Sequence, residues 1–506
     1  MVGLAGVRVG RAEVRNVRRR PLPHSTRDRF QSLPGVSVVK LTFWGAARTV
    51  TGSLHMLEFG ERRVFLDCGL YQGRRSQEHL NREFPADPAS VDAVFLSHAH
   101  IDHSGLLPRL WREGFRGTVW ATDATRDLCS YMLADSAHIQ QKDAEKRRRR
   151  GRRPHDETAE PLYDAADVDG VMDCFESVEY GVPIHPFPEL EVEYRDAGHI
   201  LGSASITLTL REDGGEVRLG FTGDLGRSDR PILRDPQTLP DCDYLICEST
   251  YGGMVHDPPD QARERLARVI GETAARGGRV VVPAFAVGRT QEIVHRLDQL
   301  VNEGRLPPIP IFVDSPLAVN VTEVFRRHPE CYDPELLDYM EQDPNPFGFD
   351  RLAYIRDTED SRRLNGTQMP MMIISASGMA TAGRILHHLK HSLEDPKDTV
   401  LMVGYCAPGT LGRDLIEGKE EVRIFGEPYR VRAEVEVMNA YSAHADEPAL
   451  VEFVGELDPD RLRRIFLVHG DPERQEKLGL ALTAAGYPRW SAPARGEVVE
   501  LSVARR

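Results

Sequence analysis

The stretch "LSHAHIDHSG", residues 96–105, collects three histidines and one aspartate at the end of the apolar run "DAVFL". These side chains are His98, His100, Asp102 and His103. If the segment is extended, the first two histidines point to the same side, and the aspartate and third histidine must turn elsewhere. The glycine that follows permits such a turn. A polar surface turn and a metal site are both compatible with this stretch alone.

Other strand-like runs also end in residues that can bind metals or move protons. "VFLD", "YRDAGH", "LGFTGD", "YLICE" and "IFLVH" end at Asp67, His199, Asp224, Glu248 and His469. Proteins of the α/β class usually place their chemistry at strand ends along one edge of a sheet. One such residue more often has a structural role. Six strand ends that all carry His, Asp or Glu indicate a common site.

The side-chain types indicate which ions this site would take. Imidazoles and carboxylates suit zinc, and manganese or iron less often. The absence of cysteine argues against a closed structural zinc site. Five imidazoles and two carboxylates are too many for one tetrahedral ion. They suit two ions that share a bridging carboxylate and a bridging water, a pair that can activate the water for phosphate displacement.

Length and composition set the broad class of the protein. A chain of 506 residues predicts two or three domains, and 41% apolar with 28% charged residues is ordinary for a globular protein. The longest strongly apolar stretch, "VVVPAFAV", is far shorter than the roughly 20 residues of a membrane span. The seven scattered cysteines form no CxxC pair, which favours a reducing compartment and a cytoplasmic location.

Charge is distributed unevenly along the chain. The net charge of −14 argues weakly against nonspecific nucleic-acid coating, but residues 1–40 carry +7 and the remainder −21. We interpret residues 1–37 as a basic, disordered extension. A second basic run, "KRRRRGRR" at 146–153, could follow an RNA backbone or be the solvated end of a helix.

The order of strands and helices predicts a domain inserted into another domain. Residues 38–251 are mostly strands and short turns, apart from a helix over 124–148. Residues 252–433 begin with a helix over 260–278 and alternate helix with strand, which indicates a parallel sheet with its own core. Residues 434–506 return to the first style. We therefore expect a discontinuous α/β domain with a second α/β domain inserted into it.

These motifs together resemble a known family. "SHAHIDH" resembles the HxHxDH signature of the metallo-β-lactamase superfamily. The insertion, with "CEST" before it and "YSAHAD" and "LVHG" after it, looks like the β-CASP branch, which contains the endonuclease subunit of the eukaryotic cleavage and polyadenylation factor and bacterial and archaeal relatives. The resemblance covers roughly residues 38–500 and implies an αββα sandwich with an inserted β-CASP domain.

The resemblance also implies roles for individual residues. One zinc would be bound by His98, His100 and His199, the other by Asp102, His103 and His469, with Asp224 as the bridge. Asp67 would orient the ligand loop. His444 would be the general acid for the leaving ribose oxygen, with Glu248 holding and polarising it. A histidine tuned by a carboxylate can supply such a proton near neutral pH.

We therefore predict a zinc-dependent ribonuclease that hydrolyses RNA with a two-metal-activated water, in RNA processing or decay. Manganese is the alternative metal. His469 favours RNA, because DNA-specific members of the family tend to have valine at this motif. We expect single-stranded RNA as the partner, without a membrane, and a homodimer is compatible with the sequence. Endonuclease and 5′-exonuclease modes both stay open.

Two other functions compete with this prediction. The same metal core could serve a hydrolase for a non-nucleic-acid ester, such as a thioesterase or a lactamase-like enzyme. The inserted domain and the pair Glu248 and His444 argue against it. The chain could also be a noncatalytic RNA-processing scaffold, but its intact ligand set argues against that role.

Two further segments are candidates for substrate binding. "SASGMATAGR" (375–384) contains Ser375, Ser377 and Gly378 and has the form of a strand, a loop and a helix start, where backbone amides suit a phosphate. A plain strand-to-helix turn is the alternative. In "PAFAVGRTQE" (283–292), Arg289 could contact a phosphate or could pack the two domains together.

Overall fold

The structure is a computed structural model that describes residues 39–72, 75–149, 160–212, 215–256, 260–404, 406–407, 409–438 and 442–505. The predicted basic extension, residues 1–37, and the last four residues of the second basic run, 150–153, lie outside the described residues. Within the described ranges, no helix has the length and hydrophobicity of a membrane span.

The first sheet has seven strands in the order β22-β1-β2-β3-β4-β5-β6. Their bounds are β1 Val39–Phe43, β2 His55–Phe59, β3 Arg62–Leu66, β4 Ala93–Phe95, β5 Thr118–Thr122, β6 Phe175–Val178 and β22 Glu497–Leu501. The strands are antiparallel from β22 to β3 and parallel from β3 to β6. The opening histidine cluster follows β4, so it lies at an end of the parallel part.

The second sheet follows the order β21-β20-β11-β10-β9-β8-β7, with β23 paired to β10. Its strands are β7 Ile184–Phe187, β8 Leu190–Asp196, β9 Ala204–Glu212, β10 Gly215–Phe221, β11 Tyr244–Glu248, β20 Arg464–Val468, β21 Trp490–Ser491 and β23 Ala504–Arg505. β20 reaches this sheet from the far side of the insertion and pairs with β11 in parallel. The two parts of the discontinuous domain therefore share this sheet as well as the first, which β22 joins.

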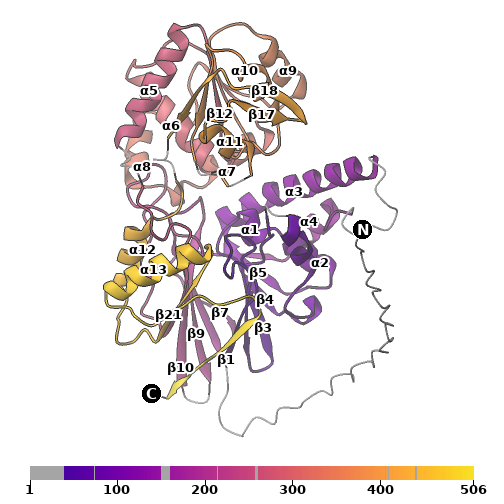
Figure 1. Ribbon diagram of the computed structural model, residues 1–506. Helices are drawn as coiled ribbons and strands as arrows, with labels where there is room; N and C mark the ends of the chain where they lie inside the picture. Colours follow the sequence, from indigo (N-terminus) through magenta and orange to yellow (C-terminus); the bar gives the residue numbers. More distant parts are fainter. Residues whose placement is uncertain are drawn as a thin grey trace, which may run out of the picture. The chain divides into compact units, whose positions relative to one another are not determined.

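The two sheets pack face to face, and helices cover their outer faces (Figure 1). Successive residues of a strand point to opposite faces of its sheet. Phe95 of β4 and Phe466 of β20 pack between the two sheets, whereas their neighbours Val94 and Leu467 face helices. Helices α1 Ile101–Ser104, α2 Leu107–Arg112, α3 Asp123–Arg149 and α4 Ala165–Met172 belong to the first sheet, and α12 Glu447–Gly455 and α13 Pro472–Ala484 to the second. The predicted αββα sandwich is confirmed, and α3 matches the helix predicted over 124–148.

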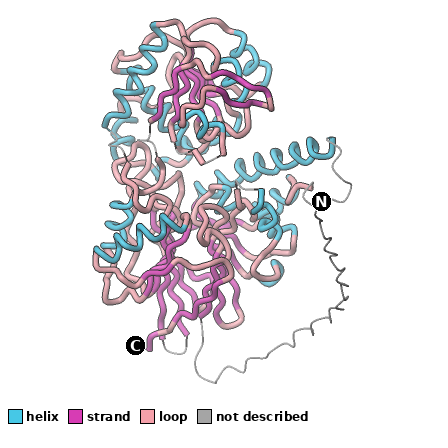
Figure 2. Tube along the Cα trace, in the orientation of Figure 1, coloured by secondary structure: helices cyan, strands magenta, loops and turns pink. Residues whose placement is uncertain are grey.

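The inserted domain has a six-stranded, all-parallel sheet in the order β14-β13-β15-β12-β16-β19, seen as a separate group of strands in Figure 2. These strands are β12 Arg279–Pro283, β13 Ile311–Val313, β14 Leu352–Tyr354, β15 Met371–Ser375, β16 Thr399–Met402 and β19 Glu434–Val437. Because β19 completes this sheet, the inserted domain extends beyond the boundary expected at residue 433.

Helices and one hairpin complete the inserted domain. They are α5 Asp260–Ala275, α6 Arg289–Asn302, α7 Pro316–Arg327, α8 Pro334–Met340, α9 Thr358–Gly366, α10 Ile385–Ser392, α11 Leu411–Ile416 and the strands β17 Glu421–Ile424 and β18 Glu427–Arg430. Short 3-10 helices occur in the first part of the sandwich at Arg75–Arg82 and Pro88–Ser90, and in the inserted domain at Pro329–Cys331. The alternation of helix and parallel strand agrees with the pattern predicted from the sequence.

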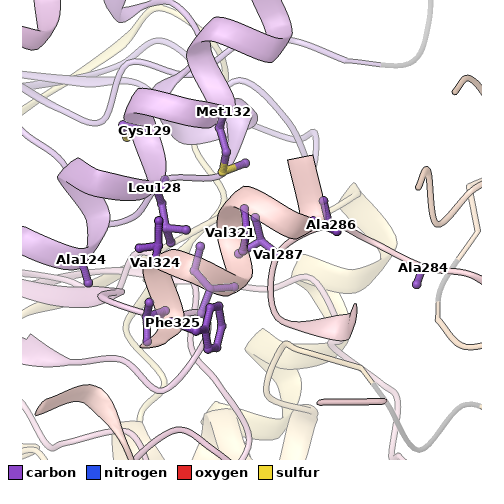
Figure 3. Packing of buried hydrophobic residues seen from close by; sticks show 14 of the residues in the cluster. Ala124, Leu128, Cys129, Met132, Ala284, Ala286, Val287, Val321, Val324 and Phe325 are labelled. Atoms are coloured by element: carbon purple, nitrogen blue, oxygen red, sulfur yellow. The ribbon is translucent and has the colours of Figure 1, made fainter. Parts of the chain in front are cut away.

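The inserted domain shares an apolar core with helix α3. Figure 3 shows Leu128 and Met132 of α3 beside Val321, Val324 and Phe325 of α7. All five side chains belong to one cluster of buried residues. Burying one such side chain stabilises the folded protein by roughly 1.5–3 kcal/mol. The contact between α3 and α7 is therefore a substantial hydrophobic interface.

Helix α13, which begins three residues after His469, is seated by a close contact between Gly479 and the indole of Trp490. A Cβ added at Gly479 would lie 2.2 Å from that ring. The adjacent Leu478 is fully buried in the cluster that α13 forms with the second sheet. The glycine therefore allows α13 to pack close to β21.

We predict that Gly479→Ala lowers the melting temperature, whereas Gly271→Ala raises it. Overpacking typically costs about 1–3 kcal/mol, which exceeds the roughly 0.5–1 kcal/mol that alanine gains over glycine in a helix. Gly271 lies inside α5, and nothing lies within 4 Å of a Cβ added there. Gly271→Ala should therefore gain the helix stability of alanine without any cost from overpacking. Thermal unfolding by circular dichroism compares the two variants. A Gly479→Ala protein that melts at or above the wild-type temperature would contradict this packing.

Candidate metal centre

Asp67 organises the loop that carries the opening motif. It follows β3 with a φ of 60°, a region that non-glycine residues seldom adopt, and its side chain is fully buried. Oδ1 accepts from the Ser97 amide at 2.8 Å, and Oδ2 accepts from the hydroxyls of Ser53 at 3.0 Å and Ser97 at 3.1 Å. Oδ2 also lies 2.7 Å from His103 Nδ1. This contact orients the His103 ring, so that Nε2 faces the centre.

His98, His100 and His199 form the first donor set. His100 Nδ1 lies 3.2 Å from His98 Nε2 and 3.2 Å from His199 Nε2. One imidazole nitrogen offers a single proton or a single lone pair, so it cannot make two good hydrogen bonds. Donors around a tetrahedral zinc at about 2.0–2.1 Å lie roughly 3.3 Å apart. The three nitrogens are therefore spaced as ligands of one ion.

Asp102, His103 and His469 form the second donor set. His103 Nε2 lies 3.1 Å from His469 Nε2, which is 3.6 Å from Asp102 Oδ2. The opposite nitrogen of His469, Nδ1, contacts the Thr250 hydroxyl at 3.0 Å. A contact of this kind fixes the ring and leaves Nε2 for a metal. The spacing again suits a shared ion.

Asp224, which follows β10, lies between the two donor sets. Its Oδ2 is 3.5 Å from His98 Nε2, 3.6 Å from His199 Nε2 and 3.3 Å from His103 Nε2. Its Oδ1 is buried, and no group in the described ranges hydrogen-bonds it, although His469 Nδ1 lies 3.4 Å away. A buried carboxylate oxygen without a hydrogen bond is costly. A cation between the two sets would compensate it.

The protonation of the first donor set also suits a metal. Burial lowers the pKa of His98 and His199 well below the usual range and that of His100 to about 4. These imidazoles are therefore neutral at pH 7, with lone pairs free to bind a cation.

The charges of the centre require compensation. Four carboxylates lie here, those of Asp67, Asp102, Asp224 and Glu248, and across the described residues their ion pairs involve only histidines. Divalent cations held by the two donor sets would supply positive charge beside these carboxylates. The residues thus fit the metal pair that the sequence predicted.

His444 stands beside the centre and pairs with Glu248. Glu248 is fully buried at the end of β11, and its Oε1 accepts from the Leu225 amide at 2.7 Å and lies 3.3 Å from His444 Nδ1. Nδ1 of His444 is 3.9 Å from Asp224 Oδ2. Burial opposes the charged imidazole, but the carboxylates of Glu248 and Asp224 outweigh it and raise the pKa of His444 to about 9. This arrangement provides a protonated imidazole next to the metal centre.

The predicted substrate-binding residues lie on the inserted domain, outside the two donor sets. Ser375 is buried, and its hydroxyl donates to the Asp314 carbonyl at 2.7 Å. The Ser377 hydroxyl accepts from the Thr381 amide at 3.0 Å, which closes a turn. Arg289 is 6% exposed and pairs with Glu292 at 2.6 Å. Substrate contact by Ser375 and Arg289 stays a prediction.

Gly378 has a different role in this segment. A Cβ added there would lie 2.7 Å from the ring of Phe285, so the glycine lets the two loops approach closely. Phe285 is 40% exposed. Substrate contact by Gly378 and Ser377 stays a prediction.

Three supporting residues were not singled out from the sequence. Ser53 and Ser97 bind the Asp67 carboxylate, and Thr250 contacts His469. Ser97 lies inside the opening motif, next to His98, so its position offered a signal. Thr250 likewise lies inside the "CEST" motif, two residues after Glu248. Ser53 offered no signal, because serine is common in turns.

Three family models match the chain in succession. Residues 62–275 match a beta-lactamase superfamily domain, residues 290–415 a Beta-Casp domain, and residues 428–491 a Zn-dependent metallo-hydrolase RNA specificity domain. The three matches follow the order of the first part of the sandwich, the insertion and the returning part.

Curated relatives match most of the chain. Ribonuclease TTHA0252 from Thermus thermophilus is 37% identical over 449 residues, which cover 88% of this chain and 97% of the relative. Transcription termination factor FttA from Methanosarcina mazei is 30% identical over 467 residues, covering 89% of this chain and 69% of that protein. A protein of unknown function from Enterococcus faecalis V583 has a solved structure with a TM-score of 0.51 at 14% identity, covering 92% of this chain and all of that one, which supports the fold alone. The chain therefore belongs to the β-CASP family of metal-dependent RNA hydrolases with the metallo-β-lactamase fold.

Proposed function

We propose that the chain is a zinc-dependent ribonuclease that hydrolyses phosphodiester bonds of single-stranded RNA at the centre around Asp224. The observation that carries the proposal is the contact of Asp224 with both donor sets, with His444 held beside it by Glu248. The similarity to a ribonuclease over nearly that protein's whole length supports RNA as the substrate.

The first donor set would hold one ion and the second donor set the other. Asp224 would contribute to the binding of both ions. When bound, two zinc ions lower the pKa of water and offset the charge of the phosphate. Manganese is the alternative ion, since imidazole and carboxylate ligands also accept it. The two separate groups of potential ligands support two divalent ions rather than one.

The remaining residues orient groups and move a proton. Asp67 contacts Nδ1 of His103 and Thr250 contacts Nδ1 of His469, and these contacts fix both rings and leave each Nε2 for a metal. Glu248 stabilises the imidazolium form of His444, which would donate its proton to the leaving ribose oxygen. Because the pair stands at the edge of the metal centre, the acid is close to where a bound phosphodiester would break.

A hydrolase for another ester is the competing function. The Glu248–His444 pair argues against it, because a weakly acidic leaving group such as a ribose hydroxyl gains most from a general acid. Cytoplasmic location and a homodimer stay predictions from the sequence, and cleavage mode stays open.

We predict that the purified protein cleaves RNA labelled at either end and that a chelator stops it. Single-stranded DNA of the same sequence should be cut more slowly, since one lost hydrogen bond to a 2′-hydroxyl is worth about 1 kcal/mol, or roughly fivefold. Gel electrophoresis of products from both labels also separates endonuclease from exonuclease cleavage. Equal rates on DNA and RNA would contradict the RNA assignment.

Metal analysis after dialysis should find two equivalents of zinc per chain. Asp224→Ala should lose both, because it removes the carboxylate that contacts both donor sets. His185→Ala serves as the matched control, because His185 is exposed on β7 and should leave the metal content unchanged. Full nuclease activity with one equivalent or none would overturn the two-ion centre.

Replacement of His444 by alanine should reduce RNA cleavage by about 10²–10⁴-fold, the usual contribution of a general acid. The zinc content should stay at the wild-type value, because His444 belongs to neither donor set. Steady-state kinetics and metal analysis on the same preparation test both statements. Loss of zinc in this variant would instead make His444 a ligand or a structural residue.

A further inference from the structure

Arg230 joins three segments that are far apart in the sequence. Its Nη1 donates to the backbone carbonyls of His199 at 3.1 Å and Ala443 at 3.2 Å. Its Nη2 donates to the Glu292 carboxylate in the first turn of α6, at 3.3 Å. The side chain is only 9% exposed. One guanidinium therefore connects the inserted domain to two loops of the candidate centre.

The carbonyl of Ala443 gives this connection its importance. Ala443 directly precedes His444, and its oxygen also lies 3.4 Å from His199 Nδ1. On the other side of His444, the Ala445 amide donates to the Leu225 carbonyl at 2.8 Å. The backbone is thus held on both sides of His444, the proposed acid. Arg230, which binds the carbonyl before His444, also binds Glu292 of the inserted domain.

The charges around Glu292 decide which residue can be tested. Glu292 is buried and accepts from both Arg230 and Arg289. Without Arg230, the carboxylate would keep its ion pair with Arg289. Without Glu292, two buried guanidinium groups would lose a shared carboxylate, and removing one member of a buried pair is strongly destabilising. Arg230 can therefore be replaced at a lower cost in stability than Glu292.

We infer that Arg230 is a positioning residue, which uses the inserted domain as an anchor to place His444 for proton transfer to the leaving oxygen. The inference rests on the proposed ribonuclease function. The simpler alternative is that Arg230 only fastens the inserted domain. Arg234, in the same loop, does this without touching the centre, since its Nε donates to the Tyr332 carbonyl at 3.2 Å. Arg234 is thus a matched control.

The test compares two substrates that differ in their need for an acid. RNA has a ribose hydroxyl as its leaving group, whereas bis(p-nitrophenyl) phosphate releases a nitrophenolate that needs no proton. Arg230→Met should lower kcat on RNA by about 10- to 100-fold, the cost of a misplaced catalytic group. Its kcat on the nitrophenyl substrate and its zinc content should stay close to the wild-type values.

The other variants complete the design. His444→Ala should also lose activity selectively on RNA, by about 10²–10⁴-fold, as expected for loss of the acid. Arg234→Met should resemble the wild type on both substrates. Arg230→Lys should fall between wild type and Arg230→Met, because a single ammonium cannot reproduce the planar fork that spans two carbonyls and a carboxylate. If Arg230→Met does not fold, Arg230→Lys carries the same comparison.

The outcomes separate the inference from the function on which it rests. Equal losses on both substrates, loss of zinc, or wild-type kinetics for the Arg230 variants would overturn the positioning role while leaving the ribonuclease intact. A wild-type protein that does not cleave RNA would overturn the proposed function itself. A fully active His444→Ala variant would overturn the acid role of His444, and with it the positioning role of Arg230.

Discussion

The centre depends on one buried carboxylate, that of Asp224. Its oxygens lie within 3.6 Å of nitrogens from four histidines, and one oxygen has no hydrogen bond within the described ranges. A buried charge of this kind is tolerated only where a compensating charge is close. The histidines arrive from both sheets and from both sides of the insertion, so a compensated Asp224 requires the complete sandwich.

The insertion lies between the two members of the acid pair in the sequence. Glu248 ends the strand before it, and His444 lies shortly after its last strand, β19. Their contact brings the start and the end of the insertion together beside the metal centre. The apolar contact between α3 and α7 and the ion pair of Arg230 with Glu292 give the inserted domain further attachments. The inserted domain is thus fixed close to the chemistry.

The structure brings together the donors that the sequence indicated, and most of them follow strands with apolar ends, although β8, before His199, alternates charged and apolar residues. Strands such as β4 and β20 are recognisable from their composition, and their last residues must gather at a sheet edge. The strand β19 was misplaced because "EVEV" alternates charged and apolar residues, as a strand with one exposed face does, and so resembles the first domain's style. The pairing of β19 with β16 could not be read from the sequence. The contacts of Arg230 depend on how two domains meet, which no local pattern records.

The most direct measurement is anomalous diffraction from crystals of the zinc-loaded protein, collected at the zinc absorption edge. Two peaks are expected, one bounded by His98, His100 and His199 and the other by Asp102, His103 and His469. The Asp224 carboxylate should lie between the two peaks. A single peak, or peaks away from these side chains, would contradict the two-ion centre.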